Sequence, residues 1–136
     1  VVYGKSVSNA ARIWWLLKYV GVRNVALLDG GWELWIKEER PVDRSTPQLE
    51  DSDFKPQFQA DRLAEIESIK QSLGTKGIQI VDTRSDREFN AGRIPGSVHL
   101  EWTHLLREDG RFKTRMQLKE IFQKQGIRSA DTAVCY

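Results

Sequence analysis

The sequence predicts an α/β fold in which a parallel central sheet is covered by helices on both faces. Two observations support this fold class. Segments with apolar residues at helical spacing alternate along the chain with shorter runs, and these runs are rich in apolar residues. Strands buried on both faces have that apolar character, and strands that alternate with helices form parallel sheets. The apolar runs lie at residues 25–28, 78–82, 97–100 and 132–136.

The first stretch of the chain, residues 1–40, contains two predicted helices around one predicted strand. Ser8-Asn9 offers an N-cap to the first helix, Gly21 ends that helix, and Pro41 closes the second one. Residues 1–3 resemble a strand already under way and do not include Met, so we expect a processed product or a fragment. In chain order, the predicted elements are a helix at residues 10–20, a strand at residues 25–28 and a helix at residues 32–39.

A segment without periodicity, residues 41–57, is rich in proline and polar residues and is typical of a linker between two structural units.

The second stretch, residues 58–136, begins with a helix that Asp61 can cap. Functional sites in such folds lie where the carboxyl ends of strands meet helix N-termini. In chain order, the predicted elements are a helix at 62–73, a strand at 78–82, a helix at 86–91, a strand at 97–100, helices at 102–106 and 115–125, and a strand at 132–136.

Composition excludes several classes of function. The 21 basic and 19 acidic residues are mixed along the chain, without the basic cluster of a nucleic-acid binder, and no apolar stretch is long enough to span a membrane. A single cysteine excludes an internal disulfide, and His99 and His104 lack metal-ligand spacing, so we expect no metal site. The single cysteine is compatible with a reducing compartment; we expect a cytoplasmic protein, with the mitochondrion as the alternative.

Three parts of the chain carry distinctive short motifs: residues 9–15 with 28–32 (Leu-Asp-Gly-Gly-Trp), residues 81–85 and 88–89 with 92–97 (Gly-Arg-Ile-Pro-Gly-Ser), and residues 109–113. Together these motifs resemble the rhodanese family of sulfurtransferases. The family's closing motif precedes its opening motif, which is the order found in the middle of a tandem two-domain member. The resemblance therefore implies that residues 1–40 end a first, non-catalytic domain and that residues 58–136 begin a second domain, cut off at its active-site loop.

The resemblance implies an enzyme that moves sulfane sulfur from thiosulfate or 3-mercaptopyruvate to a thiophilic acceptor, cyanide or a thiol. The sulfur would travel on a cysteine persulfide, without a cofactor. The alternative is a non-catalytic rhodanese-homology module that binds a partner or regulates. Phosphatase-type use of a related loop is a third possibility, and it requires a longer loop after the cysteine. Residues 4–8, which match the loop of the first domain, contain no cysteine.

Cys135 is the sole candidate nucleophile in the chain. In the family, however, the reactive cysteine commonly follows an aromatic or other strand residue. On this second interpretation, the nucleophile is the residue after Tyr136 and Cys135 is a buried strand residue. We favour it over Cys135 as the nucleophile, and we expect little activity from the chain as given. The resemblance also implies site-supporting roles for Asp82, through hydrogen bonds to loop amides, and for Arg84, through electrostatics. The equal alternative is an ion pair that fixes the strand-to-helix turn.

Two assemblies are compatible with this order of motifs. Either two incomplete units are joined by the linker, or residues 1–40 complete the sheet of residues 57–136 in permuted order. The permuted assembly buries apolar strand faces, at roughly 25 cal/mol per Å², so we favour it for a compact structure. In that case residues 1–3 and 132–136 compete for one position in the sheet.

Overall fold

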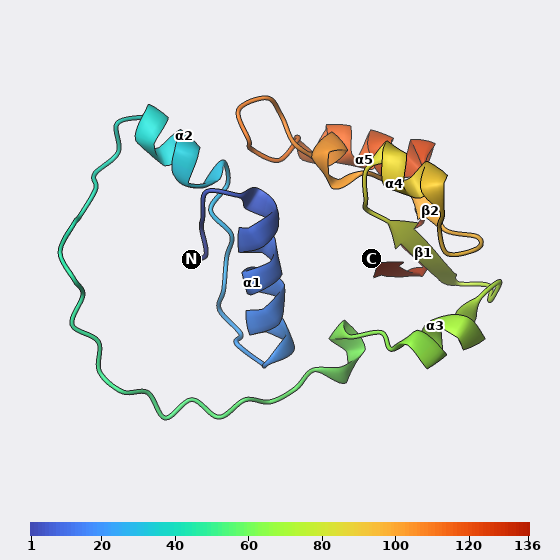
Figure 1. The fold of residues 1–136 in the computed structure, drawn as a ribbon, viewed down its shortest axis with the longest axis horizontal. Helices are drawn as coiled ribbons and strands as arrows, with labels where there is room; N and C mark the ends of the chain where they lie inside the picture. The colour runs from blue at the N-terminus through green and yellow to red at the C-terminus, as the bar shows by residue number, and fades with distance from the viewer. The chain divides into compact units, whose positions relative to one another are not determined.

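The computed structural model describes all 136 residues, which divide into two compact units, Val1–Leu63 and Ala64–Tyr136. The first unit contains helices α1 (Val7–Tyr19) and α2 (Gly31–Lys37) and a 3-10 turn, η1 (Ala60–Arg62) (Figure 1). Helix α1 begins earlier than predicted because the hydroxyl of Ser6, not of Ser8, accepts the Asn9 amide and caps the helix.

The strand predicted at residues 25–28 is reduced to a single parallel bridge between Val2 and Leu27. Two backbone hydrogen bonds make this bridge: the Val2 amide donates to Ala26 at 2.7 Å, and the Leu28 amide donates to Val2 at 2.9 Å. The apolar run at residues 25–28 therefore pairs with the first residues of the same unit. This pairing is limited to one bridge, so no regular strand forms.

The end of the predicted linker returns to the first unit. The amide of Gln57 donates to the carbonyl of Val20 at 2.9 Å, and that of Gln59 to the carbonyl of Tyr19 at 2.8 Å. The ring of Phe58 lies 5.3 Å from that of Tyr19. These contacts place residues 57–59 against the carboxyl end of α1.

The second unit carries the sheet. The helix predicted at residues 62–73 is shorter in the structure, since it begins only after Glu65. Asp61, the predicted N-cap, lies in η1 and does not cap this helix.

None of the chain's helices combines the length and apolar character needed to cross a membrane. The elements of this unit are α3 (Ile66–Ser72), β1 (Ile78–Asp82), α4 (Asp86–Ala91), β2 (Val98–His99), η2 (Trp102–Leu105), α5 (Arg115–Lys124) and β3 (Thr132–Cys135).

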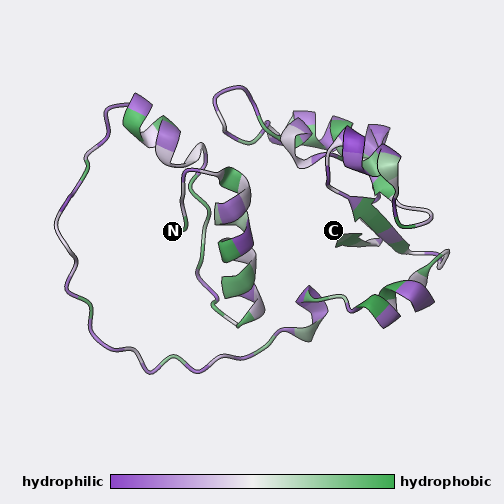
Figure 2. Cartoon of the chain, in the orientation of Figure 1, coloured by the Kyte–Doolittle hydropathy of each residue, from purple (hydrophilic) through white to green (hydrophobic).

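The three strands form a parallel sheet in the order β2-β1-β3, which confirms the predicted α/β class. The central strand, β1, is largely hydrophobic (Figure 2). The most deeply buried apolar side chains of the unit are Ile80, Val81 and Leu100. All three strands of this sheet belong to the second unit, with β3 beside β1, and the sheet is not closed.

Helix α4 begins where it does because of a reciprocal cap. The Ser85 hydroxyl accepts the Glu88 amide, and the Glu88 carboxylate accepts the Ser85 amide at 3.1 Å. The hydroxyl and amide of Ser85 lower the pKa of Glu88, which keeps this cap ionised. The cap ends the segment that leaves β1 and therefore fixes residues 83–85 beside the carboxyl ends of the strands.

Candidate functional site

The carboxyl ends of the three parallel strands meet at one edge of the sheet. Strand β1 ends at Asp82, and Tyr136 follows β3. The carbonyl of Tyr136 accepts two hydrogen bonds from Thr83, one from the amide at 2.9 Å and one from the hydroxyl at 2.7 Å. On the other side of β1, the Leu100 amide donates to the Asp82 carbonyl at 2.9 Å. These contacts hold the backbone after all three strands in place.

Asp82 is the centre of this edge, and its side chain is fully buried. One carboxylate oxygen, Oδ1, accepts the backbone amide and the Nε of Arg84, both at 3.0 Å. The other, Oδ2, accepts Nη2 of Arg84 and the hydroxyl of Tyr136, both at 2.6 Å. The Arg84 hydrogen bonds, and then that of Tyr136, outweigh burial and hold the pKa of Asp82 well below its usual range. We call Asp82, Arg84 and Tyr136 the Asp82 cluster.

Arg84 directs its guanidinium into the protein. Besides its two contacts with Asp82, Nη2 donates to the carbonyl of Gly92 at 2.8 Å, and the guanidinium lies 5.2 Å from the centre of the Tyr136 ring. The carboxylate raises the pKa of Arg84 further above its already high value. These contacts favour the second of the two roles left open by the sequence, an ion pair that fixes the strand-to-helix turn. Asp82 accepts one loop amide, that of Arg84 itself.

Tyr136 belongs to the site although sequence reasoning gave it no role. Its hydroxyl donates to Asp82, accepts the backbone amide of Ile94 at 3.0 Å and lies 3.4 Å from the hydroxyl of Ser97. It therefore connects the end of β3 to the turn that follows α4. A signal for this role existed in the sequence, because a phenol follows one predicted strand and a carboxylate ends another.

His99 supports the same loop from β2. Its Nε2 lies 2.9 Å from the carbonyl of Arg84, its Nδ1 lies 3.4 Å from a carboxylate oxygen of Asp86, and its ring stacks on Phe89 at 4.3 Å. The imidazole therefore joins the residue after β1 to the first turn of α4. From the sequence we predicted only that His99 does not bind a metal. The structure gives it a role in holding this loop.

Cys135 is not brought together with the other predicted site residues. It pairs with Val81 in the register of β1 and β3. Paired residues share a face of a sheet and successive residues alternate, so the thiol is on the face opposite to the side chains of Asp82 and Tyr136. Cys135 lies in β3 as the favoured interpretation expects, but the prediction that it is buried is wrong, because the residue is exposed in this short strand at one side of the sheet. The protein around the thiol nevertheless raises its pKa by desolvation. An activated thiolate has the opposite shift.

Comparison with known proteins identifies the family to which this sequence is similar. The model of the Rhodanese-like domain matches residues 1–38 and 65–136. Thiosulfate sulfurtransferase of Gallus gallus is 29% identical over 93% of this chain and 47% of its own length. Human 3-mercaptopyruvate sulfurtransferase is 28% identical over 93% of this chain and 48% of its own length. The chain thus spans about half the length of the curated relatives it matches.

Solved structures show the same fold. The crystal structure of the 3-mercaptopyruvate sulfotransferase of Escherichia coli matches with a TM-score of 0.83 and 28% identity, over 93% of this chain and 50% of that one. An anaerobic ergothioneine biosynthesis enzyme from Chlorobium limicola matches with a TM-score of 0.82 over 93% of this chain and 35% of that one; at 20% identity it supports the fold alone. By its matched residues and its fold, the chain belongs to the rhodanese family.

Proposed function

We propose that this chain is part of a sulfurtransferase that carries sulfane sulfur from thiosulfate or 3-mercaptopyruvate to cyanide or a thiol. The observation that carries the proposal is the Asp82 cluster, which anchors the last residue of the chain at the edge of the sheet where such folds place their sites. The names of the relatives, thiosulfate and 3-mercaptopyruvate sulfurtransferases, support the choice of donors.

The nucleophile in this proposal is a cysteine directly after Tyr136, and Cys135 is a strand residue. Thr83 holds the Tyr136 carbonyl with two hydrogen bonds, so the next residue starts from a fixed position at the strand ends. Backbone amides of a turn at that position would stabilise a thiolate there. Asp82 and Arg84 act as positioning residues, because their contacts are with each other and with the backbone of the turn.

The proposed reaction has two steps. The thiolate attacks the sulfane sulfur of thiosulfate, the bond between the two donor sulfurs breaks, and sulfite leaves with the electron pair. With 3-mercaptopyruvate, the carbon–sulfur bond breaks and the carbon takes up a proton to give pyruvate. The acceptor then attacks the outer sulfur of the persulfide and releases the cysteine thiolate.

The proposed context is a tandem protein in the cytoplasm. Residues 1–40 would close a first domain without a nucleophile, which the absence of cysteine from residues 4–8 supports. Residues 58–136 would open the catalytic domain.

A transfer assay with thiosulfate and cyanide tests the proposal. We expect a polypeptide extended past Tyr136 to turn over, because it contains the loop that activates the thiol, and we expect residues 1–136 alone to be inactive. Family-typical turnover by residues 1–136 would show that Cys135 suffices and would contradict the placement of the nucleophile. An inactive extended protein that folds normally would favour the binding-module alternative.

A further inference from the structure

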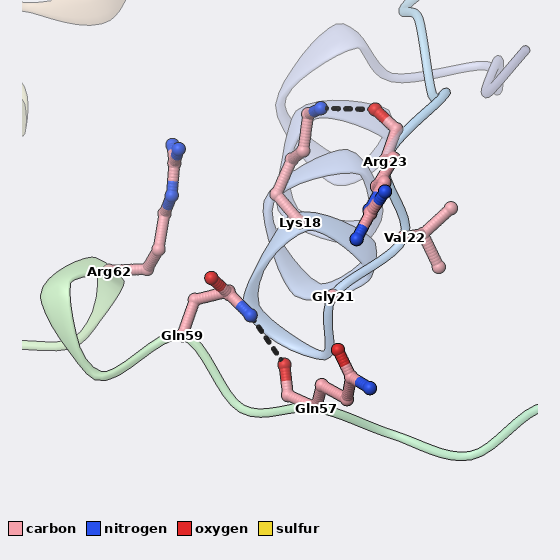
Figure 3. A pocket seen from close by; sticks show the side chains of 7 residues that line it. All are labelled: Lys18, Gly21, Val22, Arg23, Gln57, Gln59 and Arg62. Carbon is pink, nitrogen blue, oxygen red and sulfur yellow. Dashed lines mark hydrogen bonds between the residues drawn. The ribbon is translucent and has the colours of Figure 1, made fainter.

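A polar pocket of about 330 Å³ lies at the carboxyl end of α1, within the first unit. Figure 3 shows Arg62 on one side, Lys18 and Arg23 on the other, and the segment of Gln57 and Gln59 between them. Its volume is within the usual range of small-molecule sites. The lining residues are Lys18, Gly21, Val22, Arg23, Gln57, Gln59 and Arg62.

The carbonyl groups at this helix end are already satisfied by amides. The carbonyls of Tyr19 and Val20 accept the amides of Gln59 and Gln57. Those of the preceding three residues accept amides of the helix end itself, from Val20, Val22 and Gly21. The partial negative charge of a helix carboxyl end is therefore largely compensated by backbone donors, and it does not require the nearby cations.

The lining carries three cationic side chains, Lys18, Arg23 and Arg62, and no carboxylate. Neither arginine forms an ion pair, whereas Arg40, Arg84, Arg107 and Arg128 elsewhere in the chain all do. Lys18 donates from Nζ to the carbonyl of Arg23 at 2.6 Å, which leaves two of its three protons for a ligand. The pocket thus concentrates positive charge that the protein itself does not neutralise.

Gly21 allows the floor of the pocket to form. Its φ is +94°, and a Cβ on this residue would lie 2.8 Å from the carbonyl oxygen of Gln57. A side chain here would push residues 57–59 away from the helix end. The glycine therefore permits the close approach that brings Arg62 and the two glutamines beside Lys18 and Arg23.

We propose that this pocket binds a tetrahedral oxyanion of the phosphate or sulfate type, free or as the phosphoryl group of a small metabolite. Guanidinium groups bind such oxygens in pairs of parallel hydrogen bonds, and an ammonium group adds a point charge. The site is independent of the sulfur-transfer chemistry, because all its residues belong to the first unit.

Titration of the 136-residue chain with inorganic phosphate at constant ionic strength tests the proposal by NMR. The indole N–H of Trp15 is the reporter, because Nε1 donates to the carbonyl of Arg62 at 3.2 Å. We expect a saturable shift of this signal in the wild type and a dissociation constant about tenfold higher in Arg62→Gln, which removes one charged partner. Arg62→Lys, which keeps the charge, should bind between the two. The backbone carbonyl that holds Trp15 remains in both variants.

Arg12→Gln is the matched control, because it removes the same charge from an exposed position of α1 outside the pocket. It should change the dissociation constant by less than about twofold. A parallel titration with glycerol 3-phosphate identifies the source of the anion: tighter binding of the ester indicates a metabolite, and equal or weaker binding indicates the free ion. No saturable shift with either compound up to about 20 mM, or equal weakening by Arg12→Gln and Arg62→Gln, would overturn the proposal.

Discussion

Replacement of Asp82 by alanine is expected to destabilise the second unit by roughly 3 kcal/mol. The carboxylate is fully buried and accepts hydrogen bonds from Arg84 and Tyr136 through both oxygens. Its removal leaves the guanidinium without a counter-ion and the phenol with only the longer contact to the Ser97 hydroxyl, at 3.4 Å. Because the Arg84 side chain is 33% exposed, water can solvate part of its charge, so the loss should fall at the lower end of that seen for buried pairs.

Urea denaturation of the wild type and of Asp82→Ala measures this loss. Glu67→Ala is the control, because Glu67 also pairs with a cation, Lys70 at 2.7 Å, but both side chains are solvent-exposed. The control should lose far less stability, as exposed pairs do. Equal effects of the two substitutions would show that the Asp82 carboxylate contributes no more than a surface charge.

The same carboxylate predicts a dependence of stability on pH. The pKa of Asp82 is lowered in the folded state from its ordinary value of 3.8, first by Arg84, so the ionised form stabilises the fold above that pH. As pH falls below 3.8 towards the folded-state pKa, this contribution is lost. We expect the stability gap between the wild type and Asp82→Asn to be constant from neutral pH down to about pH 5 and to shrink below about pH 4. A gap that stays unchanged in acid would contradict an ionised Asp82.

Replacement of Tyr136 by phenylalanine is expected to cost about 1–2 kcal/mol of stability. The hydroxyl is the donor to Asp82 at 2.6 Å and the acceptor of the Ile94 amide at 3.0 Å. Phenylalanine keeps the ring under the Arg84 guanidinium but leaves a part-buried amide without its partner. In an extended, active polypeptide the loosened end of β3 should also lower kcat for sulfur transfer more than it raises KM.

Tyr19→Phe is the matched control for this substitution. Tyr19 stacks on Trp15 at 5.4 Å and packs on Phe58, so its ring makes the contacts. Loss of its hydroxyl should change stability by less than about 0.5 kcal/mol. If Tyr136→Phe were as stable as Tyr19→Phe, the phenol would not be what holds the turn after α4 to the sheet.

The features that could be predicted from sequence are those encoded locally. Strand β1 matches the predicted residues because its short run, rich in apolar residues, begins directly after Gly77 and is a local signal. Helix α4 matches as well, because Ser85 and Glu88 form a capping box that both residues specify. The run at residues 25–28 has the same apolar character, but its partner is only Val2, so a bridge forms in place of a strand.

Features that depend on distant contacts could not be predicted. The first turn of the helix expected at 62–73 is absent because Arg62 belongs to η1, where its carbonyl accepts the Trp15 indole. Asp82 and Arg84 were identified from the family resemblance and from their place at the carboxyl end of β1. The contact of Asp82 with Tyr136, in contrast, joins residues 54 apart in sequence. The face of Cys135 likewise follows only from its pairing with Val81.

The most direct test of the proposed site is to locate the sulfur itself. A polypeptide extended past Tyr136 is treated with thiosulfate, digested and analysed by mass spectrometry for the gain of one sulfur, about 32 Da. We predict the persulfide on a cysteine directly after Tyr136 and an unmodified Cys135, in the wild type and unchanged in yield in Cys135→Ser. A persulfide on Cys135 itself, abolished by Cys135→Ser, would contradict this account.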